Sequence, residues 1–180
     1  YEQIAAVLRQ GDINYVKWDM NRSLCDIYSG SMVWQGNVMY DYMLGVYDLL
    51  ERLTQAFPDM LWEGCSGGGG RFDMGMLYYT PQIWCSDNTD AVDRIRIQYG
   101  TSFAYPLSTM GAHVSAVPNH QTGRVTDMNT RGVVAMTGAF GYELDLGKLS
   151  EEDKAAVREQ FKTYHEAAPG ILKGEYYRLS

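Results

Sequence analysis

Residues 13–22 read Ile-Asn-Tyr-Val-Lys-Trp-Asp-Met-Asn-Arg, and this stretch decides the fold. Its apolar part, from Ile13 to Trp18, predicts a buried strand that gives way to polar loop residues at Asp19. A helical pattern over residues 2–10 comes before the strand, and an amphipathic pattern over residues 38–57 comes after it. The stretch is therefore a strand set between two helices.

The same alternation repeats along the rest of the chain. Short apolar segments predict strands over residues 60–62, 82–86, 110–115 and 137–142, and helical patterns cover 91–99, 130–136 and 154–168. Ser150 with the acidic residues after it predicts the start of the last helix, and Pro169-Gly170 predicts its end. Strands that alternate with helices predict a parallel sheet covered by helices, which is an α/β fold.

The number of strands leaves two architectures open. A complete (β/α)8 barrel has eight strands and takes about 250 residues. This chain has 180 residues and five predicted strands. It is either a five-stranded doubly wound domain or the latter part of a barrel whose first strands precede it. We favour the barrel, because the chain opens on a helix.

The composition of the chain excludes some classes of binding partner and predicts the cellular compartment of the protein. The net charge is -7, with 22 acidic and 15 basic residues, so no basic stripe could neutralise phosphates and we expect no nucleic-acid partner. No apolar run approaches the about 18 residues of a membrane span, and we expect no membrane partner. Three cysteines without a CxxC pair predict a reducing compartment, the cytoplasm.

Two aspartates stand where predicted strands end. Asp19 follows the first strand, and Asp87 follows the strand over residues 82–86. If parallel strands carry both to one rim, one carboxyl group can attack or activate while the other protonates. With one strand between them, their backbones would be about 10 Å apart, and inward-leaning side chains would bring the carboxyl groups into the range of glycosidase pairs.

Lys17 shares a strand face with Asp19, because side chains alternate along a strand. One interpretation is that Lys17 donates hydrogen bonds to substrate hydroxyl groups and keeps Asp19 ionised for attack. The other interpretation is a structural Lys–Asp ion pair at a strand end. The spacing alone does not separate the two.

The loops that follow the strands predict neither a metal nor a cofactor. The run Cys65-Ser66-Gly67-Gly68-Gly69-Gly70-Arg71 matches neither the Walker pattern nor GxGxxG. Its glycines permit positive φ angles and close approach of the backbone to a ligand, or a tight turn without one. The acidic residues after Asp87 lack EF-hand spacing, and Asn88 or Thr89 is expected to cap the next helix. The histidines show no paired spacing.

Four motifs together resemble a known family. They are Lys17-Trp18-Asp19-Met20-Asn21-Arg22, the run from Cys65 to Asp73, Trp84-Cys85-Ser86-Asp87-Asn88-Thr89-Asp90, and the run from His113 to Asn119. In this order, over nearly the whole chain, they closely resemble the bacterial α-galactosidases (melibiases) of glycoside hydrolase family 36. The resemblance implies a (β/α)8 TIM barrel, of which this chain looks like strands four to eight. Residues 1–169 would belong to the barrel, and residues 170–180 would start a C-terminal β domain or a tail.

The resemblance also implies a chemistry. The mechanism is retaining, with Asp19 matching the nucleophile that forms the galactosyl-enzyme intermediate and Asp87 matching the acid/base. The expected substrates are terminal α-galactosides such as melibiose, raffinose and stachyose, and the full-length form is expected to be a homo-oligomer. The residues that the resemblance places at the galactose are Lys17, Trp18, Met20, Asn21 and Cys65, with Gly67 close by.

Other functions stay open at this point. Family members also bind the sugar through regions that precede this segment, so we expect the 180 residues alone to hydrolyse an aryl α-galactoside poorly or not at all. Related activities with the same acids are galactosyl transfer and α-N-acetylgalactosaminidase. A rival of another class is a non-catalytic carbohydrate-binding domain, in which the acids only bond sugar hydroxyls. A third is a small five-stranded α/β protein without an active site.

Overall fold

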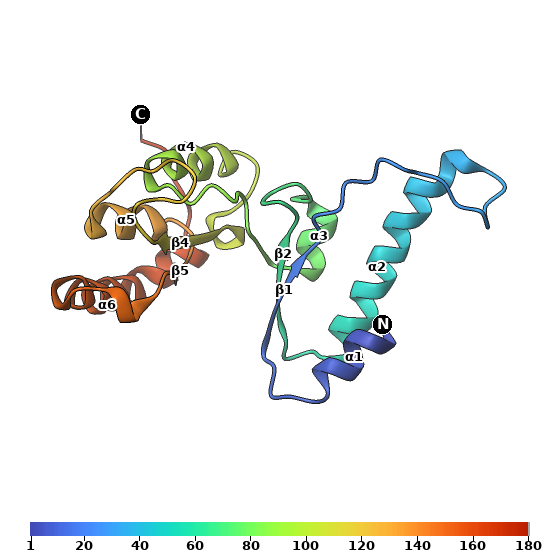
Figure 1. Ribbon diagram of the computed structural model, residues 1–180, viewed down its shortest axis with the longest axis horizontal. Coiled ribbons are helices and arrows are strands. Elements are labelled where there is room, and N and C mark those ends of the chain that lie inside the picture. Colours follow the sequence, from blue (N-terminus) through green and yellow to red (C-terminus); the bar gives the residue numbers. More distant parts are fainter. Residues whose placement is uncertain (180) are drawn as a thin grey trace.

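The computed structural model describes residues 1–179, in which strands and helices alternate along the chain (Figure 1). The strands are β1 (Tyr15–Asp19), β2 (Leu61–Cys65), β3 (Gln82–Ile83), β4 (Gly111–Ser115) and β5 (Ala139–Glu143). The helices are α1 (Glu2–Leu8), α2 (Val38–Ala56), α3 (Met74–Tyr79), α4 (Ala91–Thr101), α5 (Met128–Ala135) and α6 (Glu151–Lys173). Short 3-10 helices are η1 (Gln35–Asn37), η2 (Leu107–Thr109) and η3 (Leu146–Lys148). The predicted order of strands and helices is confirmed.

All the strand pairings are parallel. β1, β2 and β3 form one sheet in that order, and β4 pairs with β5. One parallel bridge, between Ile83 and Met110, joins the two groups, so the strands follow one another in chain order. The predicted α/β fold class is confirmed. The carboxyl ends of the strands share one edge, where ligands bind in α/β proteins, and Asp19 stands there opposite Cys65.

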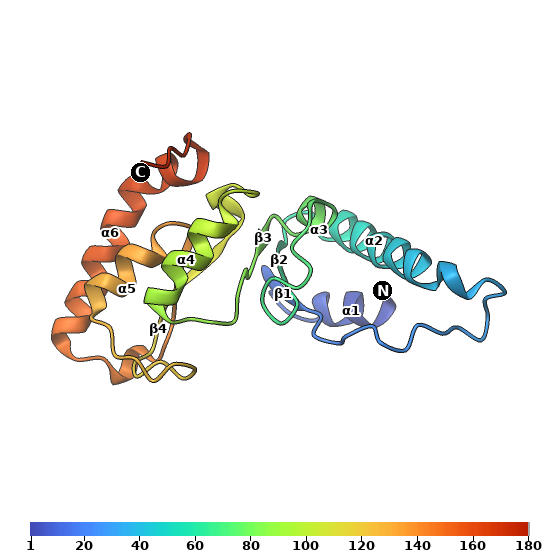
Figure 2. The same cartoon turned by 90° about the horizontal axis from the view of Figure 1, so that it is seen from above.

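The helices flank the strands in two groups (Figures 1 and 2). Helices α1, α2 and α3 lie with β1 and β2, and helices α4, α5 and α6 lie with β4 and β5. In the first group, Val16 and Trp18 of β1 pack into clusters with Leu50 and Leu53 of α2. In the second, Val114 of β4 packs against α5. Each fully buried side chain of this kind stabilises the fold by about 1.5–3 kcal/mol.

The other face of β1 is open. Tyr15, Lys17 and Asp19 alternate with the helix-facing residues and are exposed, Tyr15 by 47%. Parallel strands of α/β proteins are normally covered on both faces. The uncovered face of β1 is therefore the one that carries the polar residues of the candidate site.

Several predicted boundaries are wrong. The strand predicted over residues 60–62 is β2, which runs from Leu61 to Cys65. β3 contains only Gln82–Ile83, because its partner strand stops pairing with it at Gly64 and leads into the glycine loop. The last helix does not end at Pro169-Gly170 but continues to Lys173. A proline inside a helix removes one backbone hydrogen bond, but here the helix continues after Pro169. Its last turn is closed by Gly174 N, which donates to the Gly170 carbonyl at 2.9 Å.

Candidate functional site

The two acids flank the glycine loop at the carboxyl edge of the sheet. Asp19 is the last residue of β1, Asp87 lies in the loop between β3 and α4, and both are exposed. Asn21 Nδ2 donates to Asp19 Oδ2 at 2.9 Å, and Gly67 N donates to Asn21 Oδ1 at 2.6 Å. Across the loop, a Cβ on Gly68 would lie 2.8 Å from the Asp87 backbone nitrogen. A continuous line of contacts thus joins the two acids.

The backbone itself requires the glycines of this loop. Gly67 and Gly68 have φ angles of 54° and 79°, which side chains other than glycine rarely adopt. A Cβ on Gly69 would lie 2.6 Å from the Cys85 carbonyl oxygen. The prediction of positive φ angles is confirmed. The close approach is made to the chain's own backbone, so the loop has a structural reason for its glycines before any ligand binds.

Arg71 ties the glycine loop to the loop after β1. Its guanidinium donates to Ser66 Oγ at 2.7 Å, to the Met20 carbonyl, and to the Arg22 carbonyl at 3.3 Å. Ser66 Oγ in turn donates to the Met20 carbonyl at 2.6 Å. A hollow of about 370 Å³ opens beside these contacts, with Asn21 among its lining residues. The rim next to Asp19 is therefore concave, and hydrogen bonds from Arg71 and Ser66 hold its two loops together.

The loop that carries Asp87 is fixed by the first turn of α4. The Asp90 carboxylate caps this helix by accepting from two backbone N–H groups at 2.9 and 3.0 Å. The expected cap at Asn88 or Thr89 is wrong, because Asn88 Oδ1 instead accepts from the Asp90 N–H at 3.0 Å. Burial alone would raise the pKa of Asp90, but hydrogen bonds from Thr122 and the backbone hold it below its usual value.

On the open face Lys17 pairs with Glu63 rather than with Asp19. The strand register sets Lys17 opposite Glu63, and the Lys17 Nζ lies 3.8 Å from Glu63 Oε1. The same ammonium lies 5.0 Å from the ring centroid of Trp84. Within residues 1–179 no ion pair joins Lys17 to Asp19. The structural Lys–Asp ion pair is therefore not formed in this part of the chain. Lys17 lies on the same strand face as Asp19, but its ion-pair partner is Glu63.

Glu63 is a buried carboxyl group that sequence reasoning missed. It is 1% exposed, accepts from the Tyr15 hydroxyl group, and lies 3.3 Å from Gln82 Nε2. Burial, and then the negative charge of Glu143, raises the pKa of Glu63 to about 7. One signal was available in the sequence, since an acidic residue within an apolar strand rarely lacks a partner.

This raised pKa predicts a pH dependence of stability. The folded state holds the Glu63 proton more tightly than the unfolded chain, in which glutamate titrates near about 4.3. The protonated carboxyl group therefore stabilises the fold at low pH, and this contribution is lost as the pH rises towards about 7. We expect the thermal unfolding midpoint of the complete protein to fall, relative to its Glu63→Gln variant, between about pH 4 and about pH 7. A difference between the two proteins that stays constant over this range would contradict the raised pKa.

Trp84 and His113 continue the open face of the sheet from Lys17 of β1 towards β5. The Trp84 ring is buried, with the Arg94 guanidinium 4.1 Å and the His113 ring 4.6 Å from its centroid. Burial, and then the charges of Arg94 and Lys17, lowers the pKa of His113 to about 4, so its imidazole is neutral at neutral pH. His113 Nδ1 lies 3.9 Å from Glu143 Oε2. The sequence motif from His113 onward thus contributes to the same face as Lys17.

The remaining predicted residues divide between the rim and the core. Cys65 is buried opposite Asp19, and burial raises the pKa of its thiol to about 11, with the Asp19 carboxylate acting in the same direction. The thiol is therefore neutral. The side chains of Trp18 and Met20 instead pack into the helix-facing core, where the Trp18 ring lies 6.3 Å from that of Trp62. Met20 contacts the rim through its backbone carbonyl, which accepts from Ser66 Oγ and Arg71.

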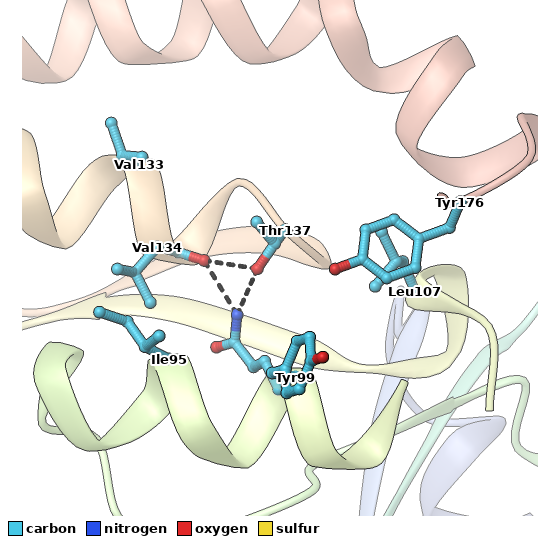
Figure 3. Close-up of a pocket in the computed structure, with 8 residues that line it drawn as sticks. Ile95, Tyr99, Leu107, Val133, Val134, Thr137 and Tyr176 are labelled. Carbon is cyan, nitrogen blue, oxygen red and sulfur yellow. Dashed lines mark hydrogen bonds between the residues drawn. The ribbon is translucent and has the colours of Figure 1, made fainter. Parts of the chain in front are cut away.

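A separate hollow lies away from the rim (Figure 3). It has a volume of about 290 Å³, and Gln98 Nε2 beside it donates to Val134 O at 2.9 Å and to Thr137 Oγ1 at 2.5 Å. Its other lining residues are Ile95, Tyr99, Leu107, Val133 and Tyr176. Because these side chains are apolar or uncharged, this hollow has none of the chemistry of the carboxylate rim.

Residues 1–179 include no helix that is both long and apolar enough to cross a membrane. In the same part of the chain, the His, Cys, Asp and Glu side chains form no group of three that could hold a metal ion. All three cysteines are free.

These features define the chain as a parallel α/β protein with two carboxyl groups at one strand edge. The Melibiase family model matches residues 1–174. The chain belongs to this family, that of the α-galactosidases of glycoside hydrolase family 36, and the resemblance seen in its motifs is confirmed.

Named relatives share this sequence and structure over part of their length. The chain is 66% identical over 180 residues to the bifunctional α-galactosidase/sucrose kinase AgaSK of Mediterraneibacter gnavus, covering 100% of this chain and 19% of that protein. It is 54% identical over 180 residues to α-galactosidase AgaA of Geobacillus stearothermophilus, covering 99% and 25%. A crystal structure of an AgaA variant in complex with raffinose matches with a TM-score of 0.97 at 53% identity, again covering 99% and 25%. The chain thus spans a quarter or less of the length of these relatives.

Proposed function

We propose that this chain forms strands four to eight of the (β/α)8 barrel of a retaining α-galactosidase. The observation that carries the proposal is the pair of exposed carboxyl groups, Asp19 and Asp87, on either side of the glycine loop. Their strands, β1 and β3, are separated by β2 alone. This spacing puts the backbones about 10 Å apart, and side chains that lean together can reach the about 5–5.5 Å of a retaining pair.

Three features support a barrel that continues beyond this segment. Within residues 1–179, β1 and β5 each pair on one side only, whereas every strand of a closed barrel pairs on both. The site face of β1 is uncovered, and the relatives are at least four times as long as the part that matches. We propose that residues 1–169 belong to the barrel. Residues 170–180 would lead into a C-terminal β domain or a tail, after α6 ends at Lys173.

The proposed reaction proceeds by double displacement. The Asp19 carboxylate attacks the anomeric carbon, while the Asp87 carboxyl group gives its proton to the glycosidic oxygen as the carbon–oxygen bond breaks. The leaving group departs as an alcohol, and the galactosyl group stays as an ester on Asp19. The Asp87 carboxylate then takes a proton from water, whose oxygen bonds to the anomeric carbon as the ester bond breaks. Two inversions give net retention.

The rim offers suitable contacts for galactose. The Lys17 ammonium has three N–H donors, and its contacts with Glu63 and Trp84 hold it on the face of Asp19. Asn21 orients the Asp19 carboxylate through one oxygen. We propose that Lys17, Asn21, the Cys65 thiol and the Gly67 loop bind the sugar hydroxyl groups. Trp18 and Met20 would contribute through their backbone.

Terminal α-galactosides are the proposed substrates. AgaA variants were crystallised in complex with raffinose and with stachyose, which supports substrates of this class, including melibiose. Free cysteines and a net charge of -7 support a cytoplasmic enzyme without a nucleic-acid partner. A homo-oligomeric full-length form completes the proposal.

The test is the identity and anomeric form of the first product. The complete protein that carries these residues should release galactose from raffinose, and proton NMR at early times should show the α-anomer before mutarotation. The β-anomer appearing first would rule out the retaining mechanism. Binding of raffinose without any release of galactose would favour the carbohydrate-binding domain, and a preference for α-N-acetylgalactosaminides would reassign the substrate.

A further inference from the structure

Arg94 of α4 holds the backbone on both sides of Asp87. Its side chain is buried, with 3% of the residue exposed. Nη2 donates to the Ser86 carbonyl at 2.7 Å, and Nε donates to the Asn88 carbonyl at 2.8 Å. These two carbonyls belong to the residues immediately before and after Asp87. One rigid, planar group therefore fixes the short segment from which the Asp87 side chain projects.

The same guanidinium anchors this segment to the sheet. Nη1 donates to the Gly111 carbonyl of β4 at 3.2 Å and to Cys85 Sγ at 3.1 Å. The guanidinium carbon lies 4.1 Å from the centroid of the Trp84 ring. The glycine loop comes close to the same segment, since a Cβ on Gly68 would lie 2.8 Å from Ser86 Cα and from Asp87 N. The Asp87 backbone is therefore held by Arg94 of α4 and lies close to the glycine loop.

The charge of Arg94 is also unusual for a buried group. Within residues 1–179 its hydrogen-bond acceptors are carbonyl oxygens and a thiol, and no carboxylate forms an ion pair with it. Burying a cation without a partner carboxylate is costly. Here the guanidinium is stabilised by the carbonyls of Ser86, Asn88 and Gly111, two of which flank Asp87.

We infer that Arg94 is a positioning residue, which holds Asp87 so that its carboxyl group delivers a proton to the glycosidic oxygen. This inference rests on the proposed function. It assigns no new chemical step, since the proton moves from Asp87 to the leaving oxygen as before. Arg94 acts through Asp87 and does not itself touch the sugar.

The test compares two leaving groups in the complete enzyme. The sugar that leaves from raffinose must be protonated at its glycosidic oxygen, whereas dinitrophenolate leaves without a proton. Only the first reaction therefore needs a well-placed Asp87. In Arg94→Lys and Arg94→Met we expect kcat/KM for raffinose to fall by about 100-fold, but kcat/KM for dinitrophenyl α-galactoside to fall by less than about 5-fold. The ratio of the two values does not depend on the fraction of folded protein.

The controls separate this inference from the proposed function. Arg96, exposed on the same helix, provides the matched variant Arg96→Lys, which should keep both values. An Asp87→Ala variant should show the same dependence on leaving group as the Arg94 variants. Equal losses on both substrates, no loss on either, or failure of both Arg94 variants to fold would make Arg94 a structural residue and overturn the inference. A wild-type enzyme that hydrolyses neither substrate would overturn the proposed function instead.

Discussion

Replacing Asp19 by glycine in the complete enzyme should lower kcat for an aryl α-galactoside by at least about 1,000-fold. The substitution removes the group that forms the ester with galactose, and nothing else on β1 can take its place. Azide should restore turnover, because it is small enough to enter the space that the carboxylate leaves. A single inversion then gives β-galactosyl azide, which NMR identifies.

The matched control is Asp12→Gly. Asp12 is also exposed, but it precedes β1 and so lies at the opposite end of the strand. We expect its kcat to stay within about twofold of the wild type. Substantial activity of Asp19→Gly without azide would show that Asp19 is not the nucleophile. If the wild type binds galactosides without hydrolysing them, and Asp19→Gly binds them with the same affinity, the protein is a carbohydrate-binding domain.

Replacing Gly68 by alanine should damage both stability and activity. The φ angle of 79° costs an alanine about 1–2 kcal/mol. The new Cβ would also lie 2.8 Å from Asp87 N and 2.8 Å from Ser86 Cα, which are backbone atoms that cannot move alone, at a further cost of about 1–3 kcal/mol. The segment that carries Asp87 must shift, and we expect kcat/KM for raffinose to fall by about 100-fold.

Gly123→Ala isolates the contribution of the backbone angle. Gly123 has a φ angle of 70°, but an added Cβ would meet no atom within 4 Å. Its thermal unfolding midpoint should therefore fall less than that of Gly68→Ala in the same complete protein. Equal shifts of the two midpoints would mean that the contact with Asp87 contributes nothing, and that the glycine loop does not set the position of this acid.

Much of this arrangement could be predicted because its signals are local. The apolar segment before Asp19 and the amphipathic pattern of α2 each depend on neighbouring residues, so periodicity identified them. The positive φ angles of the glycine loop followed from composition in the same way. Boundaries were less secure where they depend on a partner, as in β3, which ends where β2 stops pairing with it.

The residues that were missed depend on contacts between distant parts of the chain. Glu63 meets Lys17 through strand register, across 46 positions of sequence, and nothing near either residue indicates that pairing. Arg94 resembles any arginine on a helix until the fold brings its guanidinium beneath Ser86 and Asn88. The orientation of Trp18 is different, because the alternation of side chains along a strand is a local rule and places this ring in the core, on the face opposite Asp19.

The single bridge between Ile83 and Met110 makes the sheet weakest in the middle of the site. Asp19 and β3, from which the Asp87 loop leaves, stand on one side of this seam, and α4, whose Arg94 bonds both that loop and β4, lies on the other. Regions joined by few backbone hydrogen bonds open more readily than the elements beside them. A galactoside bound to Asp87 would favour the arrangement in which Arg94 holds the Asp87 loop across the seam, so we expect occupancy of the site and cohesion of the two halves to be thermodynamically linked.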